Sequence, residues 1–205
     1  MVEQTEIPES VHEQHEHAVE HADNAFRRWA AIYVGVVAMV LAISSLGGGH
    51  ATKEMLSANI HASDMYAFAQ AKYARQVAYE LAADQLDLQL AEQPSLPDEV
   101  KATIGAAIKR YRETAARYES DPPKGEGRKE LIAKAHVWEH ERDRAAAQDP
   151  NFEFAAALFQ IAIVLGSVSI VAVSRLLVGL SAVLAALATV LTVNGYFLIV
   201  TLPFG

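Results

Sequence analysis

The chain contains no cysteine among its 205 residues. This absence excludes disulfide frameworks, thiolate metal sites and cysteine nucleophiles. Basic residues are also scarce, because 17 Lys and Arg face 25 Asp and Glu for a net charge of -8. Phosphate binding requires a basic surface, so this balance argues against nucleic acid as a partner.

Charge is absent from three long stretches of the chain, which also hold no histidine. These stretches are residues 29–46, 154–174 and 176–202. At about 1.5 Å per helical residue, each can cross roughly 30 Å of hydrocarbon. We therefore expect an all-α membrane protein with three transmembrane helices, at 29–46, 153–174 and 176–202. Without ionisable residues in the spans, proton-coupled transport is disfavoured.

Basic residues at the ends of the spans predict the orientation. Arg27 and Arg28 precede the first span, and Arg175 lies in the short turn between the second and the third. Loops longer than about 60 residues cross largely regardless of their charge, so the middle segment is discounted. We expect a cytoplasmic N-terminus, with residues 47–152 extracytoplasmic and the lipid bilayer as the first partner.

The first span continues a helix that we expect to begin in water, within a tail of residues 1–28. Nothing breaks a helix from residue 11 to residue 46, and Gly47, Gly48 and Gly49 are expected to end it or to form a hinge. At the second span, Asp149 and Pro150 are expected to serve as the helix cap and the first-turn proline.

Residues 47–152 predict an extramembrane helical hairpin. One helix, 51–93, leaves the membrane, and two helices, 98–119 and 128–148, return with a loop at 120–127 between them. The lengths of the two arms match at 1.5 Å per residue, whereas three alternating helices would end far from the next span. The outgoing helix is expected to bury one stripe: Ala58, Ala62, Tyr66, Ala69, Tyr73, Val77 and Leu81. Two packed helices bury little apolar surface, so we expect a partner.

Four histidines lie in the acidic tail, and they are candidate metal ligands: His12, His15, His17 and His21. On a helix, His17 and His21 lie one turn apart, a spacing at which two imidazoles can share zinc, nickel or copper. No fixed four-ligand pattern is present, and a solvated acidic helix explains the same residues. His136 and His140 form a second pair one turn apart, but a catalytic zinc motif needs a glutamate directly after the first histidine, and Val137 occupies that position. We expect no resident cofactor beyond this possible divalent transition metal.

Small residues recur within each span at steps of three and four. In lipid, such positions let two helix backbones approach closely and gain dispersion contacts, within one chain or between copies. The predicted helix-packing residues are Ala31, Gly35, Ala38, Ala42 and Ser45 in the first span, Ala162, Gly166 and Ser169 in the second, and Ser181, Ala185, Ala188, Thr192 and Gly195 in the third. Gln160 and Asn194 are the conspicuous polar side chains at depth, and interhelical hydrogen bonds are expected for them.

The tail, residues 75–84 (RQVAYELAAD) and residues 159–167 (FQIAIVLGS) together carry a resemblance to a known family. The chain resembles the bacterial domain-of-unknown-function family 4337. The resemblance implies a small multi-pass protein of the bacterial inner membrane and no catalytic residues.

We therefore expect no enzyme. The leading hypothesis is a structural or accessory membrane protein that forms a homo-oligomer or docks to a larger membrane complex. The first alternative is a protein that binds or senses metal through its histidine tail. The second is an oligomeric channel with a polar ring from Gln160 or Asn194.

Overall fold

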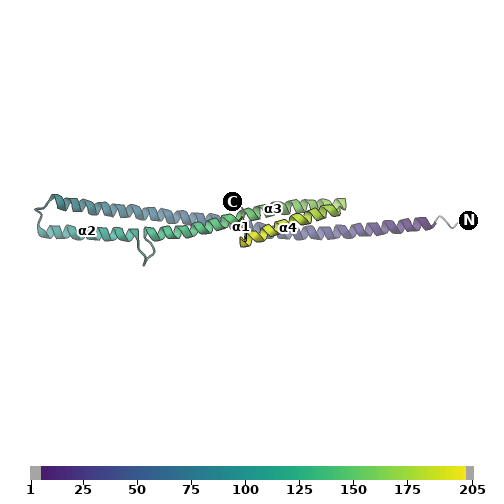
Figure 1. Cartoon of the computed structure of the whole chain (residues 1–205), viewed down its shortest axis with the longest axis horizontal. Coiled ribbons are helices and arrows are strands. Elements are labelled where there is room, and N and C mark those ends of the chain that lie inside the picture. The colour runs from purple at the N-terminus through teal and green to yellow at the C-terminus, as the bar shows by residue number, and fades with distance from the viewer. Residues whose placement is uncertain (1–5, 202–205) are drawn as a thin grey trace. The chain divides into compact units, whose positions relative to one another are not determined.

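A computed structural model describes the backbone of residues 6–201 and the side chains of residues 21–201. Four helices and no strand make up this part of the chain (Figure 1). The helices are α1 (Glu6–Glu92), α2 (Asp98–Glu119), α3 (Arg128–Ala172) and α4 (Arg175–Phe197). The prediction of an all-helical chain is confirmed.

Helix α1 continues through the three glycines at which we expected it to end. It also begins before residue 11, at Glu6. The predicted break at Gly47–Gly49 is therefore wrong. Glycine lowers helix stability but does not forbid a helix, and here the missing side chains make room for a neighbouring ring, as described below.

Helix α3 likewise continues through the position at which a new helix was expected. Pro150 lies inside it, and Asp149 is helical rather than a cap. Proline removes one backbone N–H donor from the helix. Next to it, the Asn151 side chain donates to the Ala147 carbonyl oxygen at 3.1 Å, which gives this turn an added hydrogen bond.

The remaining boundaries agree closely with the sequence, except at the end of α4. Helix α2 and the start of α3 have the expected positions, with the loop of residues 120–127 between them. Helix α4 ends at Phe197, before the expected residue 202, because Leu198 adopts a left-handed conformation (φ 46°). Its N–H still bonds to the Asn194 carbonyl oxygen at 2.7 Å, as in a left-handed helix cap.

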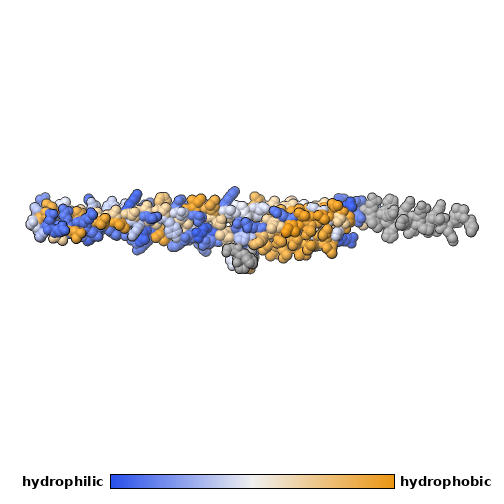
Figure 2. Space-filling view, turned by 90° about the horizontal axis from the view of Figure 1, so that it is seen from above, coloured by the Kyte–Doolittle hydropathy of each residue, from blue (hydrophilic) through white to orange (hydrophobic). Residues whose placement is uncertain are grey.

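The chain divides into two compact units. Unit 1 contains the N-terminal part up to Lys53 together with Ala145–Gly205, and unit 2 is Glu54–Arg144. Helices α1, α3 and α4 each contain a stretch long and apolar enough to cross a membrane, which confirms that part of the prediction. The surface of unit 1 is mainly hydrophobic in Figure 2, whereas that of unit 2 mixes hydrophilic and hydrophobic residues.

Candidate functional site

The apolar helices of unit 1 pack with alternating direction. Tyr33 of α1 contacts Ser181 near the start of α4, and Ser44 contacts Thr192 near its end, so these helices run parallel. Helix α3 runs opposite to both, since Gly47 of α1 lies against Phe152 near the beginning of the apolar part of α3. The core is small and made of aliphatic and alanine side chains with one fully buried ring, that of Phe159: Val37, Ala155, Phe159, Ala162, Ala185 and Ala188.

The Phe152 ring occupies a socket of glycines from two other helices. A Cβ atom at Gly47 would lie 2.5 Å from the ring, and one at Gly195 would lie 2.8 Å from it. The ring also packs edge-on against Tyr196, whose hydroxyl donates to the Ile43 carbonyl oxygen at 3.1 Å. These glycines therefore join α1, α3 and α4 at the end of unit 1 where α1 leaves for unit 2. No residue larger than glycine fits at Gly47 or Gly195 without moving the ring.

Hydroxyl groups link the helices of unit 1. The buried Ser181 hydroxyl donates to the Ala162 carbonyl oxygen at 2.6 Å, so the Tyr33 hydroxyl, 3.0 Å away, donates to Ser181. The Thr192 hydroxyl lies 3.0 Å from the buried Ser44 hydroxyl. Such bonds hold apolar helices together without introducing charge.

The small residues predicted on α3 and α4 lie inside this bundle. All are buried: Ala162, Gly166, Ser169, Ser181, Ala185, Ala188, Thr192 and Gly195. A Cβ atom at Gly166 would lie 2.6 Å from a methyl group of Val34, so the glycine allows α1 and α3 to approach closely. On these helices, the sequence spacing marks faces that pack within the chain.

On α1 the predicted small residues lie on a face that does not meet the core. Ala31, Gly35, Ala38, Ala42 and Ser45 are all exposed, and a Cβ atom at Gly35 would have no neighbour within 4 Å. The face that packs within the chain is displaced by one residue, which rotates it by about 100° around the helix. It carries Ala30, Val37, Ser44, Gly47 and Ala51.

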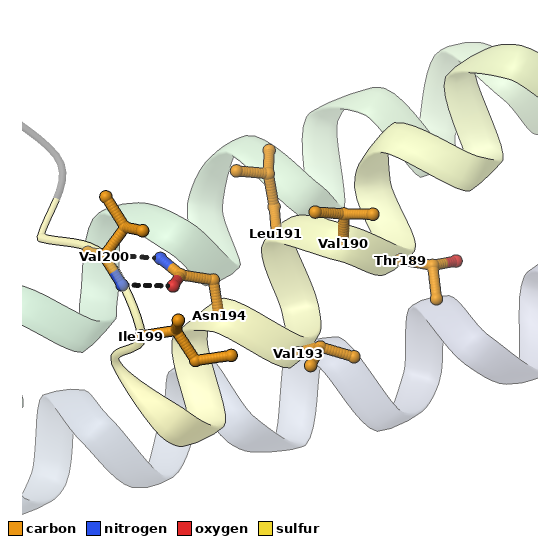
Figure 3. A pocket seen from close by; sticks show the side chains of 7 residues that line it. All are labelled: Thr189, Val190, Leu191, Val193, Asn194, Ile199 and Val200. Carbon is orange, nitrogen blue, oxygen red and sulfur yellow. Dashed lines mark hydrogen bonds between the residues drawn. The ribbon is translucent and has the colours of Figure 1, made fainter.

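A groove of about 430 Å³ lies beside the end of α4 (Figure 3). The Asn194 side chain makes two hydrogen bonds to the backbone of Val200, beyond the end of α4. Its amide donates to the Val200 carbonyl oxygen at 2.8 Å, and its side-chain oxygen accepts from the Val200 N–H at 2.9 Å. The same amide donates to the side-chain oxygen Oδ1 of Asn151 at 2.7 Å. Asn194 thus makes the interhelical bond expected from the sequence, while Gln160 is exposed. The groove lining is otherwise almost wholly apolar.

In unit 2, α1 packs antiparallel against α2 and then α3. As residue numbers fall along α1, those of the contacted residues on α2 and α3 rise. Tyr79 stacks on Tyr118, Tyr66 contacts His136, and His61 stacks on Trp138. Its inward positions recur every seven residues as two series: Ala58, Met65, Lys72, Tyr79 and Leu86, and Ala62, Ala69, Gln76, Ala83 and Leu90.

The predicted buried stripe of this helix is partly wrong. Ala58, Ala62 and Ala69 are buried, but Tyr73, Val77 and Leu81 are 41–57% exposed, and Tyr66 is exposed too. The predicted stripe uses mostly steps of four residues, whereas a straight helix has 3.6 residues per turn and a packed pair needs an average of 3.5. Its successive positions therefore rotate around the helix, away from the face that packs. The buried face therefore leaves the predicted stripe after Ala69.

Ion pairs fix the loop between α2 and α3. The Arg128 guanidinium donates two hydrogen bonds to the Glu119 carboxylate, at 2.7 and 2.8 Å, and lies over the Tyr73 ring. These bonds lower the pKa of Glu119 and raise that of Arg128. Glu130 accepts from the Ser120 hydroxyl at 2.6 Å and from the Asp121 N–H at 3.1 Å, so its pKa is lowered too.

A second polar cluster joins α1 to α3 around Tyr66. The Glu139 carboxylate lies 2.8 Å from Nδ1 of His136, which lowers the pKa of Glu139. Partial burial, with the neighbouring Glu139, raises the pKa of Tyr66. Across residues 21–201 no group of three or more metal-ligating side chains gathers, around Tyr66 or elsewhere.

The structure places one of the four predicted metal-ligating histidines. The His21 side chain is exposed on α1. The side chains of His12, His15 and His17 lie outside the described residues, so metal binding by the tail stays a prediction.

Comparison with known proteins gives one match. No curated protein and no solved structure matches the chain. Residues 26–198, which hold all four helices except the beginning of α1, match a domain of unknown function, DUF4337. The histidine tail lies outside the matched region. The chain therefore belongs to the DUF4337 family of domains of unknown function.

Proposed function

We propose that the chain is a structural or accessory protein of the bacterial inner membrane, which self-associates or docks to a larger membrane complex. In this proposal its three apolar helices span the bilayer, the N-terminus is cytoplasmic, and unit 2 is extracytoplasmic. The alternating directions of α1, α3 and α4 in unit 1 support three successive crossings. They also put Arg27, Arg28 and Arg175 at the same end of this bundle, as the positive-inside rule requires.

The observation that carries the proposal is the exposed face of α1 in unit 1. A helix face in contact with lipid gains nothing from small side chains, whereas a face in contact with another helix gains close backbone approach. On α1 this outward face is small throughout: Ala31, Gly35, Ala38, Ala42, Ser45 and Gly49. We interpret this row, which we call the small-residue face, as the contact surface for a further helix.

Two measurements test the proposal. Because the chain has no cysteine, a single Ser95→Cys variant reports which side of the membrane carries the turn between α1 and α2. We expect a membrane-impermeant maleimide to label it from the periplasmic side of intact cells with a permeabilised outer membrane. Labelling only after the inner membrane is opened would contradict the orientation. A clean monomer in mild detergent, with no partner recovered in gentle pull-downs, would contradict the associating role.

A further inference from the structure

Unit 2 carries an exposed row on α1 that its own packing does not use. Eight positions, separated alternately by four and three residues, are all exposed and all uncharged. We call them the uncharged stripe: Leu56, Ile60, Ser63, Ala67, Gln70, Ala74, Val77 and Leu81. The large members are 41–57% exposed, although unit 2 contains abundant charge elsewhere. At 1.5 Å per residue the stripe is about 38 Å long.

The stripe is distinct from the inward face of the same helix. The inward positions, such as Ala58, Ala62 and Ala69, fall between the stripe positions and are buried in the packing of unit 2. Both rows average 3.5 residues per step, the spacing that two helices need to stay in contact along their length. Helix α1 therefore has one used and one unused packing face within unit 2.

We propose that the uncharged stripe binds the same stripe of a second copy, with the two α1 helices parallel and in register. This inference rests on the proposed membrane location, because copies inserted in the same orientation run α1 in the same direction. In a parallel pair, each stripe residue meets its own counterpart. Leu56, Ile60, Val77 and Leu81 then form apolar layers, and Gln70 can hydrogen bond to Gln70 of the second copy.

The residues that flank the stripe complement one another in this arrangement. Every second stripe residue, starting with Ile60, is preceded by a flanking position. In a parallel pair, this position faces the residue of the partner helix whose number is higher by five. Asn59 then faces Asp64, and Glu80 faces Gln85, so each carboxylate meets an amide donor. Tyr66 faces Ala71 and Tyr73 faces Ala78, so each large ring meets a small side chain.

The stripe also ends where the charges stop favouring a parallel pair. The next position in the series is Asp84, which would face its own copy, and Asp87 would face Glu92. Within the chain, Arg112 pairs with both Asp84 and Asp87. The complementary part is therefore residues 56–85, and the contact does not extend to the end of the hairpin.

Single-cysteine crosslinking in lipid vesicles tests this contact without background thiols. The variants Ala67→Cys, Gln70→Cys and Ala74→Cys lie on the stripe, and Phe68→Cys and Arg75→Cys are matched exposed controls on the same helix. Disulfides need Cα atoms within about 7 Å, so we expect at least about fivefold more crosslinked dimer at the stripe positions. Crosslinking that is equal at all five positions, absent, or strongest at Phe68→Cys and Arg75→Cys overturns the proposal.

A charge substitution gives an independent readout. We expect Ala74→Glu, which places like charges opposite each other, to lower the dimer fraction in native mass spectrometry at least about tenfold. The exposed control Gln89→Glu is expected to leave it unchanged. If the oligomer persists in Ala74→Glu and the crosslinking shows no maxima on the stripe, this inference fails while the proposed self-association stands. A wild-type monomer without any partner removes both.

Discussion

Units 1 and 2 pack the same helix, α1, with different chemistry. In unit 1 its inward face meets glycines, hydroxyl groups and the Phe152 ring. In unit 2 its buried residues are all alanines, bordered by tyrosines and by pairs such as Arg112–Asp84. Among the described residues, the hydrogen bonds that link the apolar stretches of unit 1 join uncharged groups. This chemistry fits the proposed location in the bilayer, because charge is costly in hydrocarbon. Charge in unit 2 is tolerated because water can reach it.

Small residues alone do not identify the face of a helix that packs within the chain. In unit 1, small residues occupy both sides of α1, and only the side with Ala30, Ser44 and Gly47 meets its own chain. In unit 2 the alanines at the inward face pack within the chain, while Ala67 and Ala74 are exposed. A small residue permits close approach, and the partner decides whether it occurs.

The largest effect is expected for a substitution that disrupts the packing of unit 1. We expect Gly47→Ala to destabilise it by about 1–3 kcal/mol, because the new methyl group clashes with the Phe152 ring and the Tyr196 hydroxyl. Unfolding in detergent, followed by near-ultraviolet circular dichroism, measures the change. The matched control is Gly49→Ala, whose added Cβ has no neighbour within 4 Å and which should be neutral or slightly stabilising. Equal stability of the two variants would contradict the glycine socket.

A similar test applies to the alanine face of unit 2. We expect Ala69→Leu to cost about 1–3 kcal/mol, because Ala69 is buried between α1 and its returning partner. Ala67→Leu, two residues away and exposed, is expected to leave unit 2 folded. Helical circular dichroism during thermal unfolding distinguishes them. If Ala67→Leu were the more damaging substitution, the assignment of inward and outward faces would be wrong.

A smaller effect is expected at the charged loop of unit 2. We expect Glu119→Gln to lower stability by about 1 kcal/mol near neutral pH, because it removes the charge-assisted bonds to Arg128. Folding lowers the pKa of Glu119 from its ordinary value of 4.5. The stabilisation is therefore complete above that pH and lost as the pH falls through the folded pKa. If the difference in stability between the wild type and Glu119→Gln grew as the pH falls, this prediction would be contradicted.

The smallest expected effect lies at the Tyr66 cluster. We expect Tyr66→Phe to raise the pKa of Glu139 slightly, because the carboxylate loses one hydrogen-bond donor and keeps His136. Titration of the Glu139 carboxyl carbon by NMR measures this shift. An unchanged or lower pKa would show that the tyrosine hydroxyl does not bond to Glu139.

The sequence predicted much of the fold because its signals were strong and local. Charge-free runs located the three apolar stretches, and Pro94, Pro97 and the glycines of residues 120–127 located the turns. It failed at Gly47–Gly49, where α1 continues and the Phe152 ring packs against Gly47 and Gly48, and at Pro150, which lies inside α3. A single sequence does not show that Phe152 needs those glycines.

The packing residues divide in the same way. On α3 and α4 the expected small residues are buried, because each of these helices has its neighbours within unit 1. On α1 the expected residues are exposed and an adjacent face is used. The sequence contains both faces, and their periodicity is the same, so only the arrangement of the partners separates them.

The most direct test of whether α1 carries an association surface beyond the packing of its own chain is native mass spectrometry of the full chain released from lipid nanodiscs. We expect a homodimer, or a larger even-numbered assembly, that survives release. A monomer released intact, with neither a second copy nor a foreign subunit bound, would contradict it.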